Sequence, residues 1–121
     1  MSFVLEIIHD GTKERIKGRD LIDQQKTRNI VFPDLDTHLA LFASNDPILE
    51  KWKGEPNGEI IFIFCIETLF PTPHGDGKDL CVRYFLWSHT AHFWYSTYWR
   101  IDDETKWNVL ISVLVPDDLH T

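Results

Sequence analysis

The stretch from Tyr84 to Trp107 constrains the fold more than any other part of the chain. It reads YFLWSHTAHFWYSTYWRIDDETKW and holds nine of the sixteen Phe, Trp and Tyr residues. Aromatic and β-branched residues at this density favour strands. The stretch therefore predicts the centre of a β-sheet, with strands at 80–87 and 91–101 and a last strand at 107–115.

A second apolar run lies upstream, at 60–66, and reads IIFIFCI without any alternation of polar and apolar residues. A strand covered on both faces has this pattern, so the run predicts a central strand. At the N-terminus, residues 3–8 predict a strand that ends at Asp10-Gly11, a dipeptide suited to a two-residue hairpin turn. Residues 12–17 are then expected to return as a polar, exposed edge strand.

Helix signals lie between these strands. Residues 19–28 predict a short helix that rests on Leu21 and Ile22. Asp34, Asp36 or Thr37 can accept the free amides of a helix start, and apolar residues follow at helical spacing. A third helix is expected at 47–53, with Pro47 at its first position and Gly54 as its stop. The apolar faces expected of the second and third helices consist of Leu35, Leu39 and Phe42, and of Ile48, Leu49 and Trp52.

These elements predict one α+β domain spanning residues 1–121. Its antiparallel sheet is expected to have about four to six strands, arranged as an N-terminal hairpin plus a C-terminal meander, with two or three short helices packed on one face. A curved sheet that the helices close around a pocket is the structural alternative.

The last two strands can be placed in register if 102–105 connects them as a hairpin. Ile101, Trp99 and Thr97 then face Lys106, Asn108 and Leu110. Trp94 and Tyr98 fall on the more apolar face, which is expected to pack against the helices. The other face carries Phe93, Tyr95, Thr97 and Trp99. A half-open aromatic face of this kind is a binding surface, unless the sheet curls and buries it as core.

Charge is unevenly distributed along the chain. The net charge is −7, but residues 13–28 hold six basic and three acidic side chains, or +3, so the remainder carries −10. An acidic surface repels phosphate backbones and favours basic partners, or serves solubility alone. The sequence therefore predicts no nucleic-acid partner, and the basic stripe is interpreted as a solvated strand edge.

The common catalytic motifs are missing. The chain has no GxxxxGK[ST], GxGxxG, GxSxG, CxxC or HExxH pattern, so we expect no catalytic residues, no metal and no cofactor. Two alternatives stay open. His89 and His92 fall on opposite faces of a strand unless a tight turn joins them, and His74 with Asp76 lies in a Pro- and Gly-rich loop at 70–79.

The sequence also predicts where the protein resides. Cys65 and Cys81 lie in apolar runs, where free thiols behave as small buried hydrophobes, and such sparse cysteine suits a reducing compartment. No signal peptide is recognisable, and no apolar run approaches the ~20 residues of a membrane span. We therefore expect a cytoplasmic protein without a membrane partner.

Three functions are compatible with these patterns. The first is a non-enzymatic, acidic protein-binding inhibitor, immunity-protein-like, antitoxin-like or phage counter-defence-like, that neutralises a basic partner such as a toxin or effector. Its predicted aromatic anchors are Trp94, Tyr95, Tyr98 and Trp99, and its predicted acidic groups are Asp34, Asp36, Asp46, Glu50, Asp102, Asp103 and Glu104.

The second function is a small-molecule-binding or enzymatic pocket domain. Its predicted lining is Phe62, Phe64, Tyr84, Phe85 and Trp94, with His74, Asp76, His89 or His92 as polar groups. The third is a self-associating structural module, a homodimer that uses the sheet face or the last strand.

Overall fold

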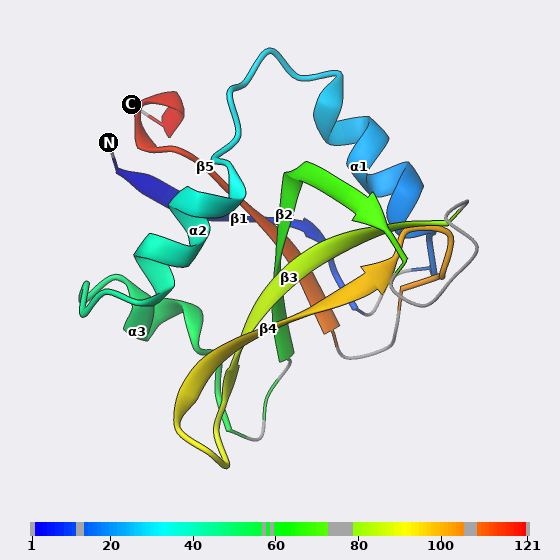
Figure 1. Cartoon of the computed structure of the whole chain (residues 1–121). Coiled ribbons are helices and arrows are strands. Elements are labelled where there is room, and N and C mark those ends of the chain that lie inside the picture. Colours follow the sequence, from blue (N-terminus) through cyan, green and yellow to red (C-terminus); the bar gives the residue numbers. More distant parts are fainter. Residues whose placement is uncertain are drawn as a thin grey trace.

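The computed structural model describes residues 2–11, 14–56, 58, 60–72, 79–105 and 109–120 (Figure 1). The strands are β1 (Phe3–His9), β2 (Ile60–Pro71), β3 (Leu80–Ser88), β4 (Phe93–Arg100) and β5 (Val109–Pro116). The helices are α1 (Gly18–Lys26), α2 (Leu35–Phe42), α3 (Leu49–Trp52) and a final 3₁₀ turn, η1 (Asp117–His120).

The five strands form one sheet in the order β1-β5-β2-β3-β4. Every pairing is antiparallel except that of β2 with β5, which is parallel, so the sheet is mixed and not purely antiparallel as predicted. The α+β character is confirmed. The apolar run at 60–66 belongs to β2, which lies between β5 and β3, and its predicted central position is confirmed as well.

The predicted N-terminal hairpin is wrong. Strand β1 pairs with β5 at the far end of the chain, where Val4 lies opposite Val115. Residues 14–16 form no strand, and Lys17 makes only an isolated bridge with Glu104, while Thr12 and Lys13 lie outside the described residues. The turn signal was local, whereas the partner of β1 was decided by a contact between the two ends of the chain.

The predicted C-terminal hairpin is also wrong, because β4 and β5 are not neighbours. Thr97 lies opposite Tyr84 of β3, and Leu110 lies opposite Ile61 of β2. Strand β5 is apolar on both faces, so it is stable only in the interior of the sheet, beside another buried strand. The predicted partners Lys106, Trp107 and Asn108 lie outside the described residues.

The segment after β4 instead pairs with the residues that lead into α1. The amides of Gly18 and Arg19 donate to the carbonyl oxygens of Asp103 and Ile101, at 3.1 and 2.6 Å. The amide of Thr105 donates to the carbonyl of Ile16 at 2.8 Å. These hydrogen bonds tie the start of α1 to the end of β4.

A bulge in β2 curls the sheet. The register with β3 shifts between Cys65 and Leu69, because these two residues lie opposite the adjacent residues Arg83 and Val82. Extra residues on one strand bend it and increase its twist. In Figure 1 the second half of β2 turns away from the first, and the end of β2, the start of β3 and the end of β4 approach α1.

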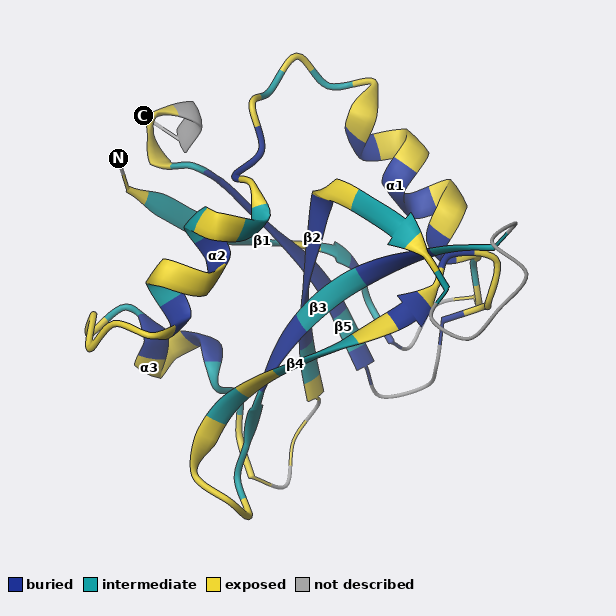
Figure 2. Cartoon of the chain, viewed as in Figure 1, coloured by how far each residue is buried: buried dark blue, intermediate teal, exposed yellow. Residues whose placement is uncertain are grey.

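The helices cover both faces of the sheet and not one face as predicted. Leu21 and Ile22 of α1 join a core cluster with Phe62 and Phe64 of β2. Helices α2 and α3 belong to a second cluster, with Ile63 and Cys65 of the same strand. Alternate residues of a strand point to opposite faces, so α1 lies on one side of the sheet and α2 and α3 on the other (Figures 1 and 2).

The second helix begins after Asp34, the first of the three predicted cap residues, and one of its buried positions differs from the prediction. Asp34 caps α2, and its Oδ1 accepts the amide of Thr37 at 2.8 Å. Phe42 is buried as expected, but Leu39 is 46% exposed and His38 takes the interior position instead. The helix is rotated so that a histidine, and not a leucine, meets the sheet.

Candidate partner-binding surface

The four predicted aromatic anchors do not share one surface. Trp99 is only 7% exposed and packs edge-on against Phe62 of β2, at 5.9 Å between ring centroids. Tyr98 and Tyr95 are 41% and 38% exposed, but successive strand residues alternate, so they lie on opposite faces of β4. The face of β4 that carries Tyr95 and Trp99 is therefore packed into the core at Trp99, beneath α1, and is exposed to solvent at Tyr95.

Trp94 is the anchor that lies in a hollowed part of the surface. It is half-buried, and its ring lies 4.8 Å from that of Phe42 and 5.7 Å from that of Trp87. A hollow opens on each side of it: one is bounded by α2 and by Tyr95, the other by α3 and Trp87. We call this surface, which Phe42, Trp87, Trp94, Asp46 and Glu50 define, the Trp94 groove.

Four acidic side chains lie in or next to α2 and α3, and two of them border the groove. Residues 29–50 contain Asp34, Asp36, Asp46 and Glu50 and neither Lys nor Arg. All four are exposed, and Asp46 and Glu50 line the hollow beside Trp94. Hydrogen bonds from Thr37 lower the pKa of Asp34. Lys51 lies in α3, and Lys53, which follows α3, lines the same hollow, pairs with Glu50 and lies 3.9 Å over the Trp87 ring.

The predicted acidic turn at 102–104 lies apart from this surface, and basic neighbours compensate it. Both carboxylate oxygens of Asp102 accept hydrogen bonds from Arg19, at 2.7 and 3.0 Å, and this contact lowers the pKa of Asp102. The backbones of Glu104 and Lys17 pair in an isolated antiparallel bridge, and the carbonyl of Asp103 accepts the indole N–H of Trp99 at 3.4 Å. The turn therefore fastens α1 to the sheet.

His38 is an interior residue that the sequence did not single out. It is 1% exposed, stacks on Phe85 at 5.5 Å, and its Nδ1–H donates to the carbonyl of Asp34 at 2.8 Å. Its Nε2 is buried with no hydrogen-bond partner among the described residues. A protonated ring would leave a buried N–H unpaired, and burial accordingly lowers the pKa of His38 below its ordinary value of 6.5.

This burial predicts a loss of stability in mild acid. Below about pH 6.5 the unfolded chain protonates His38 while the folded chain resists, so the free energy of unfolding falls as the pH decreases. Urea unfolding at a series of pH values measures the slope. The His38→Phe variant keeps the ring stack but cannot titrate, so its slope should be shallower. If the free energy of unfolding changes equally with pH in both proteins, His38 is not the group responsible.

The interior pocket of the second predicted function is filled by core. Phe62 stacks on Tyr84 with ring centroids 4.3 Å apart, and Phe62, Phe64 and Phe85 are all buried. The aromatic rings expected to line a ligand site therefore pack against one another. The packed rings of Phe62, Phe64 and Tyr84 leave no space for a ligand between them. Phe85 and Trp94, in contrast, border an open hollow beside α2, so the pocket hypothesis stays a prediction.

The structure adds no support for the two sites predicted at histidine residues. His89 donates from Nε2 to the carbonyl of Lys53 at 3.1 Å, and His92 is exposed in the β3–β4 turn with a positive φ of 59°. His74 and Asp76 lie outside the described residues. Within the described part of the chain, no group of three or more His, Cys, Asp or Glu residues could hold a metal ion. Burial raises the pKa of Cys65 to about 11, which keeps this free thiol protonated.

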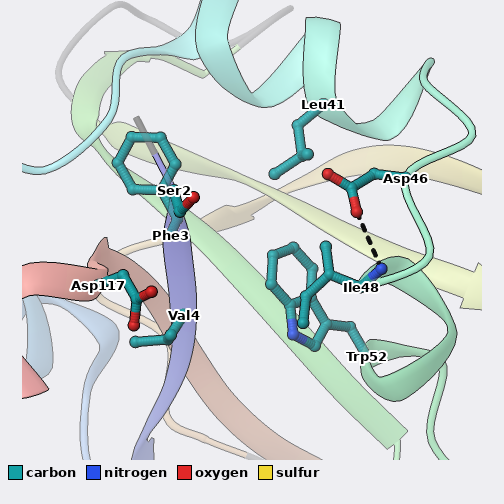
Figure 3. Close-up of a pocket in the computed structure, with 8 residues that line it drawn as sticks. All are labelled: Ser2, Phe3, Val4, Leu41, Asp46, Ile48, Trp52 and Asp117. Atoms are coloured by element: carbon teal, nitrogen blue, oxygen red, sulfur yellow. Dashed lines mark hydrogen bonds between the residues drawn. The ribbon is translucent and has the colours of Figure 1, made fainter.

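A different cavity, of about 280 Å³, lies between the start of β1 and helices α2 and α3 (Figure 3). Phe3 and Trp52 supply apolar surface, and Asp46 and Asp117 lie on opposite sides. Asp46 Oδ1 also accepts the amide of Ile48 at 3.0 Å. Asp46 thus borders both this cavity and the Trp94 groove, so one carboxylate is presented to two neighbouring hollows.

The chain was compared with protein-family models, curated proteins and solved structures. None matches. No helix among the described residues has the length and apolar character needed to cross a membrane. The geometry of the Trp94 groove is therefore the basis for a functional proposal.

Proposed function

We propose that this protein is a non-enzymatic, acidic inhibitor that binds and neutralises a basic protein partner, in the manner of immunity proteins, antitoxins or phage counter-defence proteins. One observation carries the proposal: the half-buried Trp94 lies in a groove that Asp46, Glu50 and Lys53 line, next to residues 29–50, which hold four acids and no Lys or Arg. The turn at 102–104 is no longer part of the proposed surface.

The two kinds of residue have separate tasks in such an interface. Binding energy concentrates in a few well-packed aromatic or Arg residues, and Trp94 is fixed for this role by Phe42 and Trp87. Exposed carboxylates attract a partner of opposite charge and raise the association rate. A Lys or Arg of the partner can stack on Trp94 and pair with Asp46 or Glu50.

The test begins with affinity capture from the native host, followed by binding kinetics with the captured protein. Replacing Asp46 and Glu50 together by Asn and Gln should slow association about tenfold at low salt, because steering is lost. Trp94→Ala should mainly speed dissociation and cost about 2 kcal/mol or more of binding free energy, as expected of a central anchor.

A matched control separates the groove from overall charge. Replacing Asp20 and Asp23 of α1 by Asn changes the net charge by the same amount on the other side of the sheet, and should alter association far less. Circular dichroism of each variant confirms that it is folded. The proposal fails if no basic partner is captured, or if the α1 and groove variants weaken binding equally.

A further inference from the structure

The outer edge of β4 is a regular strand edge that no described strand covers. We propose that it pairs with the same edge of a second copy of this chain, forming a two-fold symmetric dimer with one continuous sheet. The inference does not rest on the proposed inhibitor function. Three observations lead to it: the direction of the backbone groups, the regularity of the strand and the charges at its two ends.

The backbone groups that point outward can be identified. The amide of Ile101 donates to the carbonyl of Leu80 at 3.0 Å, and the β3–β4 register continues this pairing without a shift. Hydrogen-bonded and non-hydrogen-bonded pairs alternate in an antiparallel ladder. Phe93, Tyr95, Thr97 and Trp99 therefore bond to β3, whereas the N–H and C=O groups of Trp94, Ser96, Tyr98 and Arg100 point to the open edge.

This edge lacks the features with which proteins discourage strand addition. Natural edges carry Pro, Lys, inward charges or bulges. Strand β4 reads FWYSTYWR, pairs without interruption from Phe93 to Arg100, and has one charged residue, at its end. The other edge of the sheet is protected: β1 contains Glu6, which pairs with Arg28, and its register is broken between Ile7 and His9.

Charge complementarity selects a second copy as the occupant. With a two-fold axis at Thr97, Ser96 meets Tyr98 of the other copy and Trp94 meets Arg100, so every outward-facing residue is paired. Arg100, the one cation of the strand, pairs with Asp79 of its own copy at 2.9 Å, and this register also brings it beside Trp94 and the carboxylate of Asp46 of the other copy. The exposed rings of Tyr95 and Tyr98 are covered across the axis. A basic partner at the groove would compete with Arg100.

The test is analytical ultracentrifugation of the wild-type chain and of two proline variants. Proline is tolerated on an edge strand where its missing N–H faces outward. Ser96→Pro should therefore fold with a nearly unchanged melting temperature and sediment as a monomer at concentrations where the wild type is a dimer. Thr97→Pro is the matched contrast, because it removes a hydrogen bond to β3 and should unfold at a clearly lower temperature.

Amide exchange of the wild type provides a measurement that needs no variant. The amides of Ser96 and Tyr98 should become more protected as protein concentration rises, while those of Thr97 and Trp99 are protected at every concentration. A wild-type chain that stays monomeric through the high micromolar range would overturn the proposal. So would a dimer whose Ser96 and Tyr98 amides exchange at the monomer's rate.

Discussion

Trp99→Ala is expected to lower the free energy of unfolding by about 3–5 kcal/mol, the usual cost of deleting a large buried aromatic side chain. The indole is 7% exposed and contacts Phe62 and Tyr84 edge-on, at 5.9 and 6.2 Å. Its removal leaves a cavity beneath α1, and the carbonyl of Asp103 loses a hydrogen bond. Urea unfolding monitored by circular dichroism measures the loss.

The adjacent residue provides the control for this prediction. Tyr98→Ala removes a ring of similar size that is 41% exposed on the opposite face, where Phe70 is its ring contact. The expected loss is about 1 kcal/mol or less. Comparable losses at Tyr98 and Trp99 would show that the two faces of β4 are wrongly assigned.

Phe42→Ala is expected to cost about 3–5 kcal/mol and also to disturb the Trp94 groove. The Phe42 ring lies 4.7 Å from Phe85 and 4.8 Å from Trp94, so it joins α2 to the sheet and holds the proposed anchor in place. Without the Phe42 ring, Trp94 loses a packing contact and becomes more exposed to water. Tryptophan emission of the folded variant should therefore shift to longer wavelength, and urea unfolding should show the lower stability.

Leu39→Ala is the matched control on the same helix. Leu39 is 46% exposed, whereas Phe42 is buried, although the sequence pattern placed both on one interior face. Its truncation should change the free energy of unfolding by about 0.5 kcal/mol. A large loss at Leu39 would mean that α2 is rotated relative to the structure described.

Local signals in the sequence were sufficient where neighbouring residues decide the outcome. Asp34 caps α2 because a short acceptor side chain can reach the amide of Thr37. Leu21 and Ile22 are buried in α1, and Leu49 and Trp52 in α3, as their patterns predicted. The apolar run at 60–66 became the central strand because it carries no polar face to present to water.

Long-range pairing could not be predicted in the same way. The dipeptide Asp10-Gly11 and the segment 102–105 both resemble hairpin turns, yet β1 pairs with β5, and β4 pairs with β3 as the meander predicted but not with β5. Turn residues indicate which backbone angles are locally favourable. They do not indicate which strand pairs with the one before the turn. The apolar residues on both faces of β5 were the available clue, because such a strand belongs inside a sheet.

The sequence by itself determined the alternation along β4, in which Trp94 and Trp99 point to opposite faces, because a strand has a side-chain period of two. The tertiary structure decided which of these positions is covered: the bulged, curled sheet brings Trp99 under α1, and α2 and α3 leave Trp94 in a groove. It also divided the acidic residues, because Asp102 binds Arg19 at the start of α1, whereas Asp46 and Glu50 lie beside Trp94, where Glu50 pairs with Lys53. The numbers of charged and aromatic residues are properties of the sequence. Which of these residues become neighbours in space depends on strand order, which only long-range packing fixes.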